Sequence, residues 1–197
     1  MAAHPFVRGL AGGTLPAAAL AAWLQQDRCF VLEERRAVAA LLAHGPPAAL
    51  GRLLGGLDET LVAEAARFAE AAAARGLPAE VEPWPVTLGY TSFLLASAHD
   101  GLLDGLAVLF AAERAYLDTW TSVRDAGVGG SPYRDWIDNW TSPGFRGFVA
   151  DLGAELDRLA GEPPPPLAER LGTAFARAAA FELAFWEMCW RGWGWPG

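Results

Sequence analysis

Apolar residues recur every three or four positions along most of this 197-residue chain, which is the period of amphipathic helices. No long segment alternates apolar and polar residues in the manner of a half-buried strand. Glycine and proline clusters separate the helical segments. The pattern therefore predicts an all-α fold of about seven helices, packed as one domain over residues 1–197.

Start and stop signals place these helices along the chain. Thr14 is a candidate N-cap with Pro16 in the first turn, and Gly45 begins the segment that ends this first helix. The pair Gly55 and Gly56 predicts a break that divides the next segment into two helices. The predicted helices span residues 14–43, 47–75 in two parts, 86–99, 102–125, 131–140 as a short helix, 142–160 and 167–190.

The helix predicted at 102–125 carries a carboxyl group on its apolar face. At about 3.6 residues per turn, this face consists of Leu102, Leu106, Leu109, Glu113, Tyr116 and Trp120. Arg114 and Asp118 lie on the opposite face, spaced to form an ion pair in solvent. We therefore expect Glu113 to point into the interior and Arg114 to point out.

Two other helices repeat this arrangement. Asp27 lies on the apolar face of the first helix with Glu34 close to it, and Glu182 lies on the apolar face of the last. The apolar neighbours are Leu20, Trp23, Leu24, Val31 and Val38 in the first helix and Leu171, Phe175, Ala178, Trp186 and Cys189 in the last. Three separate helices are thus expected to direct a carboxyl group into the core.

Buried carboxylates require compensation, because an unpaired one costs several kcal/mol and a whole domain is stable by only about 5 to 15 kcal/mol. A single buried acid is commonly paired with an arginine or with backbone groups. Three acids on three apolar faces favour a polar pocket instead. Burial also raises the pKa of a carboxyl group towards neutrality, which suits a group that transfers protons.

Tyrosine is scarce, since the chain has three Tyr beside nine Trp and ten Phe. Tyr116 follows Glu113 by one turn on the same face, so a phenol and a carboxyl group share one wall of the predicted pocket. Tyr90 and Tyr133 are the other two. For each of the three, a core position with a satisfied hydroxyl group is an equally good interpretation.

Composition and charge exclude several classes of function. A net charge of -8, with fifteen dispersed arginines, argues against a nucleic-acid partner, and the lack of any lysine excludes Schiff-base chemistry. Cys29 and Cys189 are far apart and outside metal-binding spacing, so we expect no disulfide, no zinc site and a cytoplasmic location. Residues 9–26 lack charge but contain glycine and proline, so neither a signal peptide nor a membrane span is predicted.

Six segments together resemble the TenA family, the thiaminase II-like enzymes of thiamin-pyrimidine salvage. In chain order they are HPFVRGLAGGTLP, LQQDRCFVL, GYTSFLL, LAVLFAAERAYLDTW, YRDWIDNWTSPGF and FELAFWEMCWRGW. The resemblance spans nearly the whole chain. It implies a haem-oxygenase-like helical bundle around a central pocket, a small-molecule pyrimidine substrate, and assembly as a homo-oligomer, either a tetramer or a dimer.

The resemblance also implies roles for individual residues. Asp27 falls where the family holds the nitrogen edge of the pyrimidine, and Phe30 stands where an aromatic side chain is expected. Glu182 falls on the catalytic carboxylate. The family's active-site tyrosine positions are filled by Tyr90, Tyr116 and Tyr133.

One family position departs from the better-known pattern. The nucleophilic cysteine would stand four residues before Tyr116, where this chain has Ala112, and alanine cannot form a covalent adduct. In this respect the chain is similar to a Cys-lacking branch, TenA_E, which is associated with hydrolysis of aminomethyl- and formylaminomethyl-pyrimidines derived from thiamin. Cys189, two turns after Glu182, is interpreted as a buried thiol rather than a replacement nucleophile.

These implications give a mechanistic hypothesis, the hydrolysis of an amino- or acylamino-methyl group on a 4-aminopyrimidine to give the hydroxymethylpyrimidine. Glu182 protonates the departing amine, Glu113 activates or positions water, and Tyr116 orients water and substrate. Asp27 recognises the aminopyrimidine, and Phe30 stacks on the ring. This scheme requires no metal and no organic cofactor.

Other functions stay open at this point. Inward acids are also typical of carboxylate-metal oxidases on the same fold, but those sites use Glu-x-x-His pairs, and the isolated His4, His44 and His99 are expected at the surface or at helix ends. A protein that binds pyrimidine or thiamin without catalysis is compatible with the missing cysteine. Haem binding through His4 is disfavoured, because three acids and three tyrosines are a poor lining for haem.

Overall fold

The structure, a computed structural model, describes residues 3–78, 80–127 and 131–196. Within those ranges it contains eight α-helices and no β-strand, which confirms the predicted all-α class. The helices are α1 (Pro5–Gly12), α2 (Ala17–Ala43), α3 (Ala48–Ala73), α4 (Pro85–Asp100), α5 (Leu102–Asp125), α6 (Arg134–Trp140), α7 (Pro143–Ala160) and α8 (Pro165–Arg191). None of these helices is long and apolar enough to cross a bilayer.

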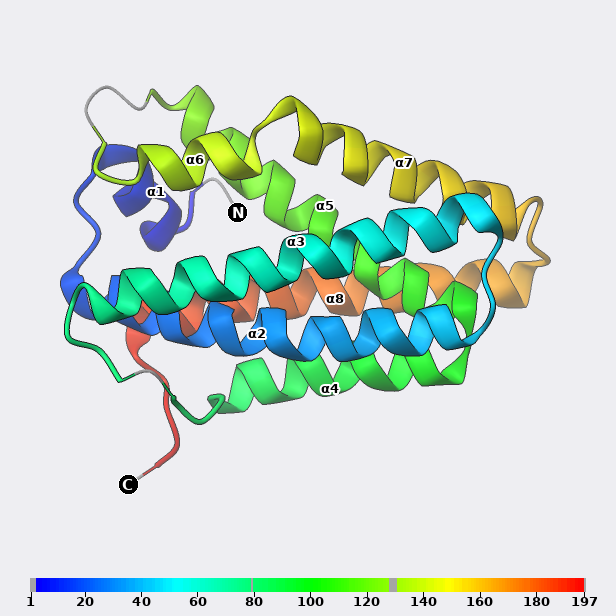
Figure 1. Cartoon of the computed structure of the whole chain (residues 1–197), viewed down its shortest axis with the longest axis horizontal. Helices are drawn as coiled ribbons and strands as arrows, with labels where there is room; N and C mark the ends of the chain where they lie inside the picture. The colour runs from blue at the N-terminus through cyan, green and yellow to red at the C-terminus, as the bar shows by residue number, and fades with distance from the viewer. Residues whose placement is uncertain (1–2, 79, 128–130, 197) are drawn as a thin grey trace.

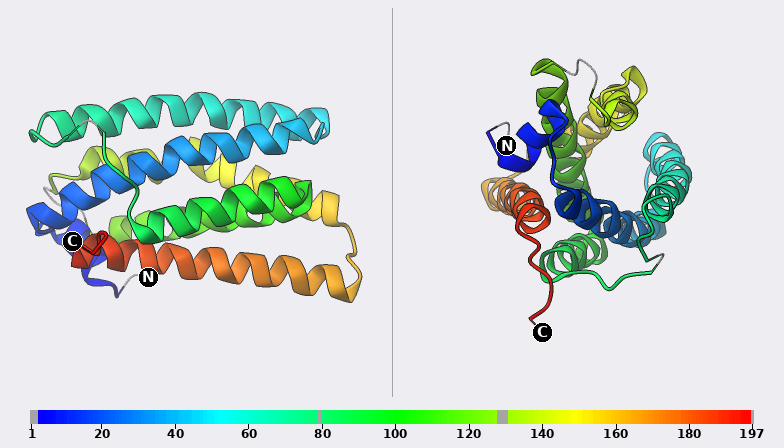
Figure 2. Two further views of the ribbon diagram at one scale, coloured as in Figure 1. Left: turned by 90° about the horizontal axis from the view of Figure 1, so that it is seen from below. Right: turned by 90° about the vertical axis from the view of Figure 1, so that its left-hand side faces the viewer.

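The long helices run side by side along the longest axis of the molecule (Figure 1). Helix α2 packs against α3, α4 and α8, while α5 packs against α4, α7 and α8. In the end-on view, α3 and α7 are neighbours on the same side of the bundle (Figure 2, right). The faces of α2, α5 and α8 that carry the inward acids therefore meet inside the bundle.

Helix α3 corrects the prediction of two helices between residues 47 and 75. It continues through Gly55 and Gly56 without a break. Each glycine costs a helix about 1 kcal/mol relative to alanine. The buried face of Leu50, Leu54, Leu57 and Leu61 extends across both glycines, and this continuous burial outweighs the weak local propensity.

Helix starts follow the predicted signals in part. The prediction of Thr14 as the N-cap of α2 is wrong, because Pro16 occupies that position and no side chain caps the helix. Helix α1 was not predicted, and it begins where the Phe6 amide donates a 3.2 Å hydrogen bond to His4 Nδ1. Helix α7 starts as expected, with Ser142 Oγ accepting a 3.1 Å hydrogen bond from the Phe145 amide.

All three histidines lie at helix ends, as the sequence predicted. His4 precedes α1, and its Nε2 lies 2.7 Å from Glu187 Oε2 on α8. His44 ends α2, with its Nε2 2.8 Å from the carbonyl oxygen of Ala98. His99 stands in the last turn of α4. The contacts of His4 and His44 give these two histidines structural roles at the ends of the bundle.

Two local features set the position of the helices around the interior. The buried side chain of Gln26, next to Asp27 on α2, accepts hydrogen bonds from the Trp84 amide at 2.7 Å and from Thr87 Oγ1 at 2.8 Å, which fixes the start of α4. Helix α5 passes very close to α4 at Gly105. A Cβ atom there would lie 2.6 Å from Ala98 Cα, so this approach requires glycine.

Candidate active site

A cavity of about 340 Å³ lies inside the bundle, within the size range of pockets for small organic ligands. Side chains from helices α2 to α8 contribute to its wall. Five acidic residues line it, namely Asp27, Glu34, Glu64, Glu113 and Glu182. The structure thus brings together the three acids that the helical patterns directed inward. Arg114, by contrast, is exposed and pairs with Asp118 at 2.9 Å, as predicted.

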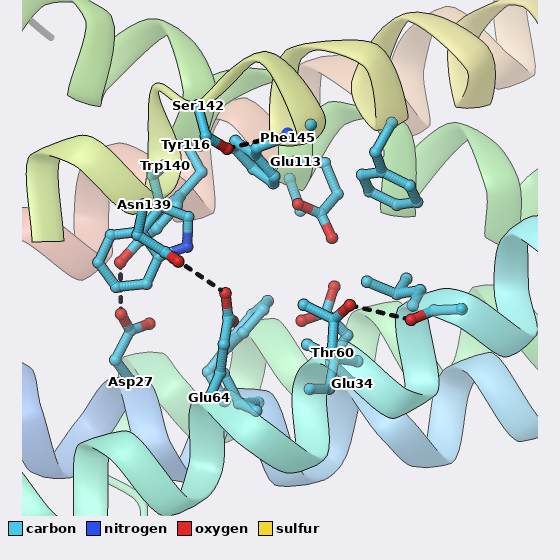
Figure 3. A pocket seen from close by; sticks show the side chains of 18 of the residues that line it. Asp27, Glu34, Thr60, Glu64, Glu113, Tyr116, Asn139, Trp140, Ser142 and Phe145 are labelled. Atoms are coloured by element: carbon cyan, nitrogen blue, oxygen red, sulfur yellow. Dashed lines mark hydrogen bonds between the residues drawn. The ribbon is translucent and has the colours of Figure 1, made fainter.

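The cavity opens between α3 and α7. Arg52, Gly56 and Thr60 are exposed on the α3 side of the opening. Phe145 and Phe148 are half-buried on the α7 side. A ligand entering here passes between polar groups on one helix and phenyl rings on the other, before it reaches the acids at the back (Figure 3).

Asp27 and Tyr116 form the shortest polar contact of the site. The Tyr116 hydroxyl donates a 2.5 Å hydrogen bond to Asp27 Oδ2, which joins α5 to α2 (Figure 3). Burial raises the pKa of Asp27 to about 7, and the hydrogen bond from Tyr116 opposes part of this rise. Asp27 can therefore hold or release a proton near neutral pH.

Tryptophan side chains hold Tyr116 in place. The Trp23 indole donates a long 3.4 Å hydrogen bond to the Tyr116 oxygen. The Trp186 ring stacks on the phenol with centroids 5.6 Å apart, and Trp140 meets it edge-on at 5.1 Å. With its ring clamped between these indoles, Tyr116 holds the Asp27 carboxyl group in one orientation.

Glu182 reaches the cavity from α8 and is 4% exposed. Burial raises its pKa to about 8, with a further rise from the charge of Asp27, while Tyr90 and Trp186 act in the opposite direction. Although these two groups are close, Glu182 Oε1, the Tyr90 hydroxyl and Trp186 Nε1 have no hydrogen-bond partner of good geometry. Each buried polar atom without a hydrogen bond lowers the stability of the fold by about 1 to 3 kcal/mol. A ligand that forms hydrogen bonds with these atoms would recover this loss.

Glu34 and Glu113 form a second acidic group within the same cavity. They come from α2 and α5, and their carboxyl groups point toward one another (Figure 3). Burial raises the pKa of Glu113 to about 8, and a hydrogen bond from Glu34 limits this rise. Burial and the neighbouring Glu113 raise the pKa of Glu34 further above its ordinary value. Glu34 is therefore the member that keeps its proton longer.

An aromatic wall stands beside these acids. Phe30 packs against Tyr90 with ring centroids 4.9 Å apart, and Tyr90 stacks on Phe181 at 5.2 Å. Phe185 meets Phe30 edge-on at 6.4 Å. Phe30, Tyr90 and Phe185 line the cavity. This wall offers ring faces and edges against which an aromatic ligand can pack.

Tyr133 is the one candidate that the structure does not bring to the cavity. It is buried, but it precedes the first residue of α6 and is absent from the lining. Trp140, at the other end of α6, lines the cavity instead. Because two helical turns separate the two positions, only the end of α6 reaches the acids.

No thiol stands on the cavity wall formed by the described residues. Ala112 lies on this wall and is 5% exposed, so a nucleophile at this position would face the ligand. Cys189 is 1% exposed, lies outside the lining, and has its thiol pKa raised well above the ordinary value by burial. Cys189 is thus a buried thiol, as the sequence indicated.

Glu64, Asn139 and Trp140 are among the lining residues that were not predicted from the sequence. Glu64 on α3 accepts a 3.4 Å hydrogen bond from Asn139 Nδ2, and both line the cavity beside Trp140. Glu64 could have been found by the same test as Glu113, because it shares a helical face with Leu57, Leu61 and Phe68. Among the described residues, no group of three His, Cys, Asp or Glu side chains could hold a metal ion.

Comparison with known proteins identifies the family of the chain. Residues 1–192 match the sequence model of the TENA/THI-4/PQQC family. The chain belongs to this family. An aminopyrimidine aminohydrolase from Halalkalibacterium halodurans is 28% identical over 204 residues, covering 98% of this chain and 91% of that protein. A Bacillus subtilis protein of the same name is 25% identical over 198 residues, covering 98% and 84%.

One further relative and two solved structures are also similar to the chain. The thiamine biosynthesis multifunctional protein ThiED of Corynebacterium efficiens is 27% identical over 195 residues, which is 95% of this chain but 26% of that protein. A TenA homologue from Pyrococcus furiosus superposes with a TM-score of 0.90 at 27% identity, over 96% of this chain and 92% of that chain. One from P. horikoshii gives 0.81 at 27%, over 97% and 91%. The fold is therefore that of the TenA proteins.

Proposed function

We propose that the protein hydrolyses an aminomethyl or formylaminomethyl group on a 4-aminopyrimidine derived from thiamin, giving the hydroxymethylpyrimidine. The observation that carries this proposal is the meeting of Glu182 with the Asp27–Tyr116 pair in one cavity. Two relatives that the chain matches over 98% of its length are named aminopyrimidine aminohydrolase, which supports this choice of substrate.

In this proposal Asp27 recognises the ring. The 4-amino group is a hydrogen-bond donor, and the Asp27 carboxyl oxygen that Tyr116 leaves free can accept from it. Tyr116 occupies Oδ2 of Asp27 and keeps the carboxyl plane fixed. The ring then packs against Phe30 and Tyr90, whose side chains form the aromatic wall.

Glu182 acts as the acid. Its raised pKa of about 8 keeps it protonated at neutral pH. Water attacks the methylene carbon, the bond from carbon to nitrogen breaks with its electron pair on nitrogen, and Glu182 donates a proton to that nitrogen. Glu113, whose pKa is also raised to about 8, accepts the proton of the water in the fraction of molecules in which it is ionised. One water is consumed, and ammonia or formamide is released.

Ala112 is the reason to propose direct attack by water. Alanine cannot form a covalent adduct at this position, and this supports our proposal that the chain is of the Cys-lacking type. The step needs no metal and no organic cofactor. A cytoplasmic location and assembly as a homo-oligomer belong to the same proposal.

Steady-state assays on three compounds test this function. The aminomethyl and formylaminomethyl pyrimidines and thiamin are offered separately, and hydroxymethylpyrimidine is quantified. We expect turnover of at least one of the first two, and slower or no turnover of thiamin. If both pyrimidines bind without turnover, the protein is a pyrimidine-binding protein and the proposed hydrolysis is wrong.

A further inference from the structure

Glu34 is a buried acid of the cavity for which the proposed reaction has no role so far. It lies two turns after Asp27 on α2, is 4% exposed, and faces Glu113, which is 8% exposed. The two carboxyl groups approach from opposite sides of the cavity (Figure 3). Neither takes part in an ion pair within the part of the chain that the structure describes.

The other acids of the cavity have different partners. Asp27 accepts its hydrogen bond from Tyr116, and Glu64 accepts one from Asn139. Glu34 and Glu113 are instead the two acids whose carboxyl groups face each other, and each raises or limits the pKa of the other (Figure 3). Two carboxyl groups that face each other in a dry site cannot both ionise easily, so one of them stays protonated and donates to the other.

The charges around the pair favour a state in which one of the two carboxyl groups stays protonated. The titratable groups around the pair are Asp27 on α2, Glu64 on α3, Tyr90 on α4, Tyr116 on α5 and Glu182 on α8, while the lining residues of α6 and α7 carry no charge. The one basic side chain in the lining, Arg52, is exposed at the opening. Nothing in this set neutralises a second negative charge on the pair.

A second observation shows that the pair faces a ligand rather than a closed core. Glu182 Oε1 and the Tyr90 hydroxyl, on the same cavity wall, are buried and have no hydrogen-bond partner of good geometry. The proposed acid and the Glu34–Glu113 pair thus line one enclosed space, with Phe145 and Phe148 beside its opening.

We propose that Glu34 is a positioning residue of the proposed hydrolysis, whose protonated carboxyl group donates to Glu113 and leaves the other Glu113 oxygen free to accept the proton of the attacking water. Glu34 itself gains and loses no proton in the cycle. The water proton goes to Glu113, the oxygen bonds to the methylene carbon, and the amine leaves with a proton from Glu182. This inference rests on the proposed function for the reaction, but the pairing of the two acids exists without substrate.

Two variants of Glu34 separate positioning from packing. Glu34→Gln keeps a hydrogen-bond donor of the same shape, whereas Glu34→Leu keeps the volume and removes the donor. For Glu34→Gln we expect kcat within about threefold of the wild type, since a neutral donor is retained. For Glu34→Leu we expect kcat at pH 7 to fall about tenfold or more and the acidic limb of kcat against pH to move up by about one unit, because Glu113 loses the donor that favours its ionised form. KM should change less than about threefold in either variant, because neither removes a group that binds the ring.

The control is Glu33→Gln, which alters a partly exposed acid paired with Arg36 outside the cavity and should leave the pH profile unchanged. Carboxyl titration of the ligand-free protein, by infrared or carbon NMR spectroscopy of labelled Glu, checks the pairing without turnover. Glu113 should titrate at higher pH in Glu34→Leu than in the wild type. The inference is overturned if this titration is unchanged, or if Glu34→Gln is as impaired as Glu34→Leu. Absence of turnover in the wild type with a shifted titration would instead refute the proposed function alone.

Discussion

The hydroxyl group of Tyr116 donates a 2.5 Å hydrogen bond to Oδ2 of Asp27, and this contact ties α5 to α2 at the back of the cavity. It does two things at once. It favours the ionised form of Asp27 against the effect of burial, and it commits one carboxyl oxygen so that the other is oriented toward a ligand. The geometry of this pair is the basis for ring recognition in the proposed function.

Replacing Tyr116 by Phe should therefore weaken binding of an aminopyrimidine. We expect Kd for hydroxymethylpyrimidine, measured by calorimetry, to rise about tenfold or more, since a hydrogen bond to a charged group contributes about 1.5 to 3 kcal/mol. Tyr133→Phe is the matched control, because that phenol does not line the cavity. Equal effects of the two variants would show that the Asp27 contact does not organise the ring site.

The opening between α3 and α7 can be tested with neighbouring glycines. Gly56 lines the cavity and Gly55 does not, and a Cβ atom at either position meets nothing within 4 Å. Gly56→Phe should narrow the entrance and lower kcat/KM about tenfold or more, because a ring there reaches toward Phe145. Gly55→Phe should leave kcat/KM unchanged while giving α3 a similar gain in helix propensity. Steady-state kinetics and thermal unfolding of both variants test whether the entrance lies between α3 and α7. Equal kcat/KM values for the two variants would show that the entrance lies elsewhere.

Buried acids should make the ligand-free protein less stable as the pH rises. Burial raises the pKa of Asp27 to about 7 and those of Glu113 and Glu182 to about 8. In the folded state Asp27 keeps its proton up to about pH 7, and Glu113 and Glu182 keep theirs up to about pH 8. The unfolded chain releases these protons near pH 4, so folding becomes less favourable as the pH rises from about 4 to those values. We expect the free energy of unfolding from denaturant titration to be at least about 2 kcal/mol lower at pH 9 than at pH 6.

Glu182→Gln supplies the control for this pH effect. The amide has the same shape and no proton to lose, so the decrease in stability between pH 6 and pH 9 should be smaller than in the wild type. Glu169→Gln, at an exposed position on α8, should leave the slope unchanged. A wild-type stability that is flat or rises over this range would mean that the three carboxyl groups are ionised in the folded protein.

Helical periodicity predicted much of the fold, and its failures have local causes. The opposite placement of Glu113 and Arg114 follows directly from the spacing of their apolar neighbours, and the structure confirms it. The predicted break at Gly55 and Gly56 was wrong, because α3 is held together by burial of its leucine face. This burial depends on tertiary packing, which local helix propensity does not describe.

The candidate site was predictable where a residue lies on a regular helix. Asp27, Glu113 and Glu182 could be placed by face alone, and the structure brings them to one cavity. Tyr133 could not be placed, because it precedes α6 and its direction depends on a chain turn that has no helical period. The pairing of Glu34 with Glu113 was also beyond the sequence, since it depends on the packing of α2 against α5.

The most direct test of the proposed hydrolysis is the turnover of Glu182→Gln on the aminomethyl pyrimidine, measured as ammonia release at pH 7 beside its Kd for hydroxymethylpyrimidine. Loss of the acid should lower kcat by about a hundredfold or more, while Kd stays within about threefold of the wild type, because Asp27 and Tyr116 still hold the ring. A Glu182→Gln protein that binds the pyrimidine and turns over at the wild-type rate would contradict the account.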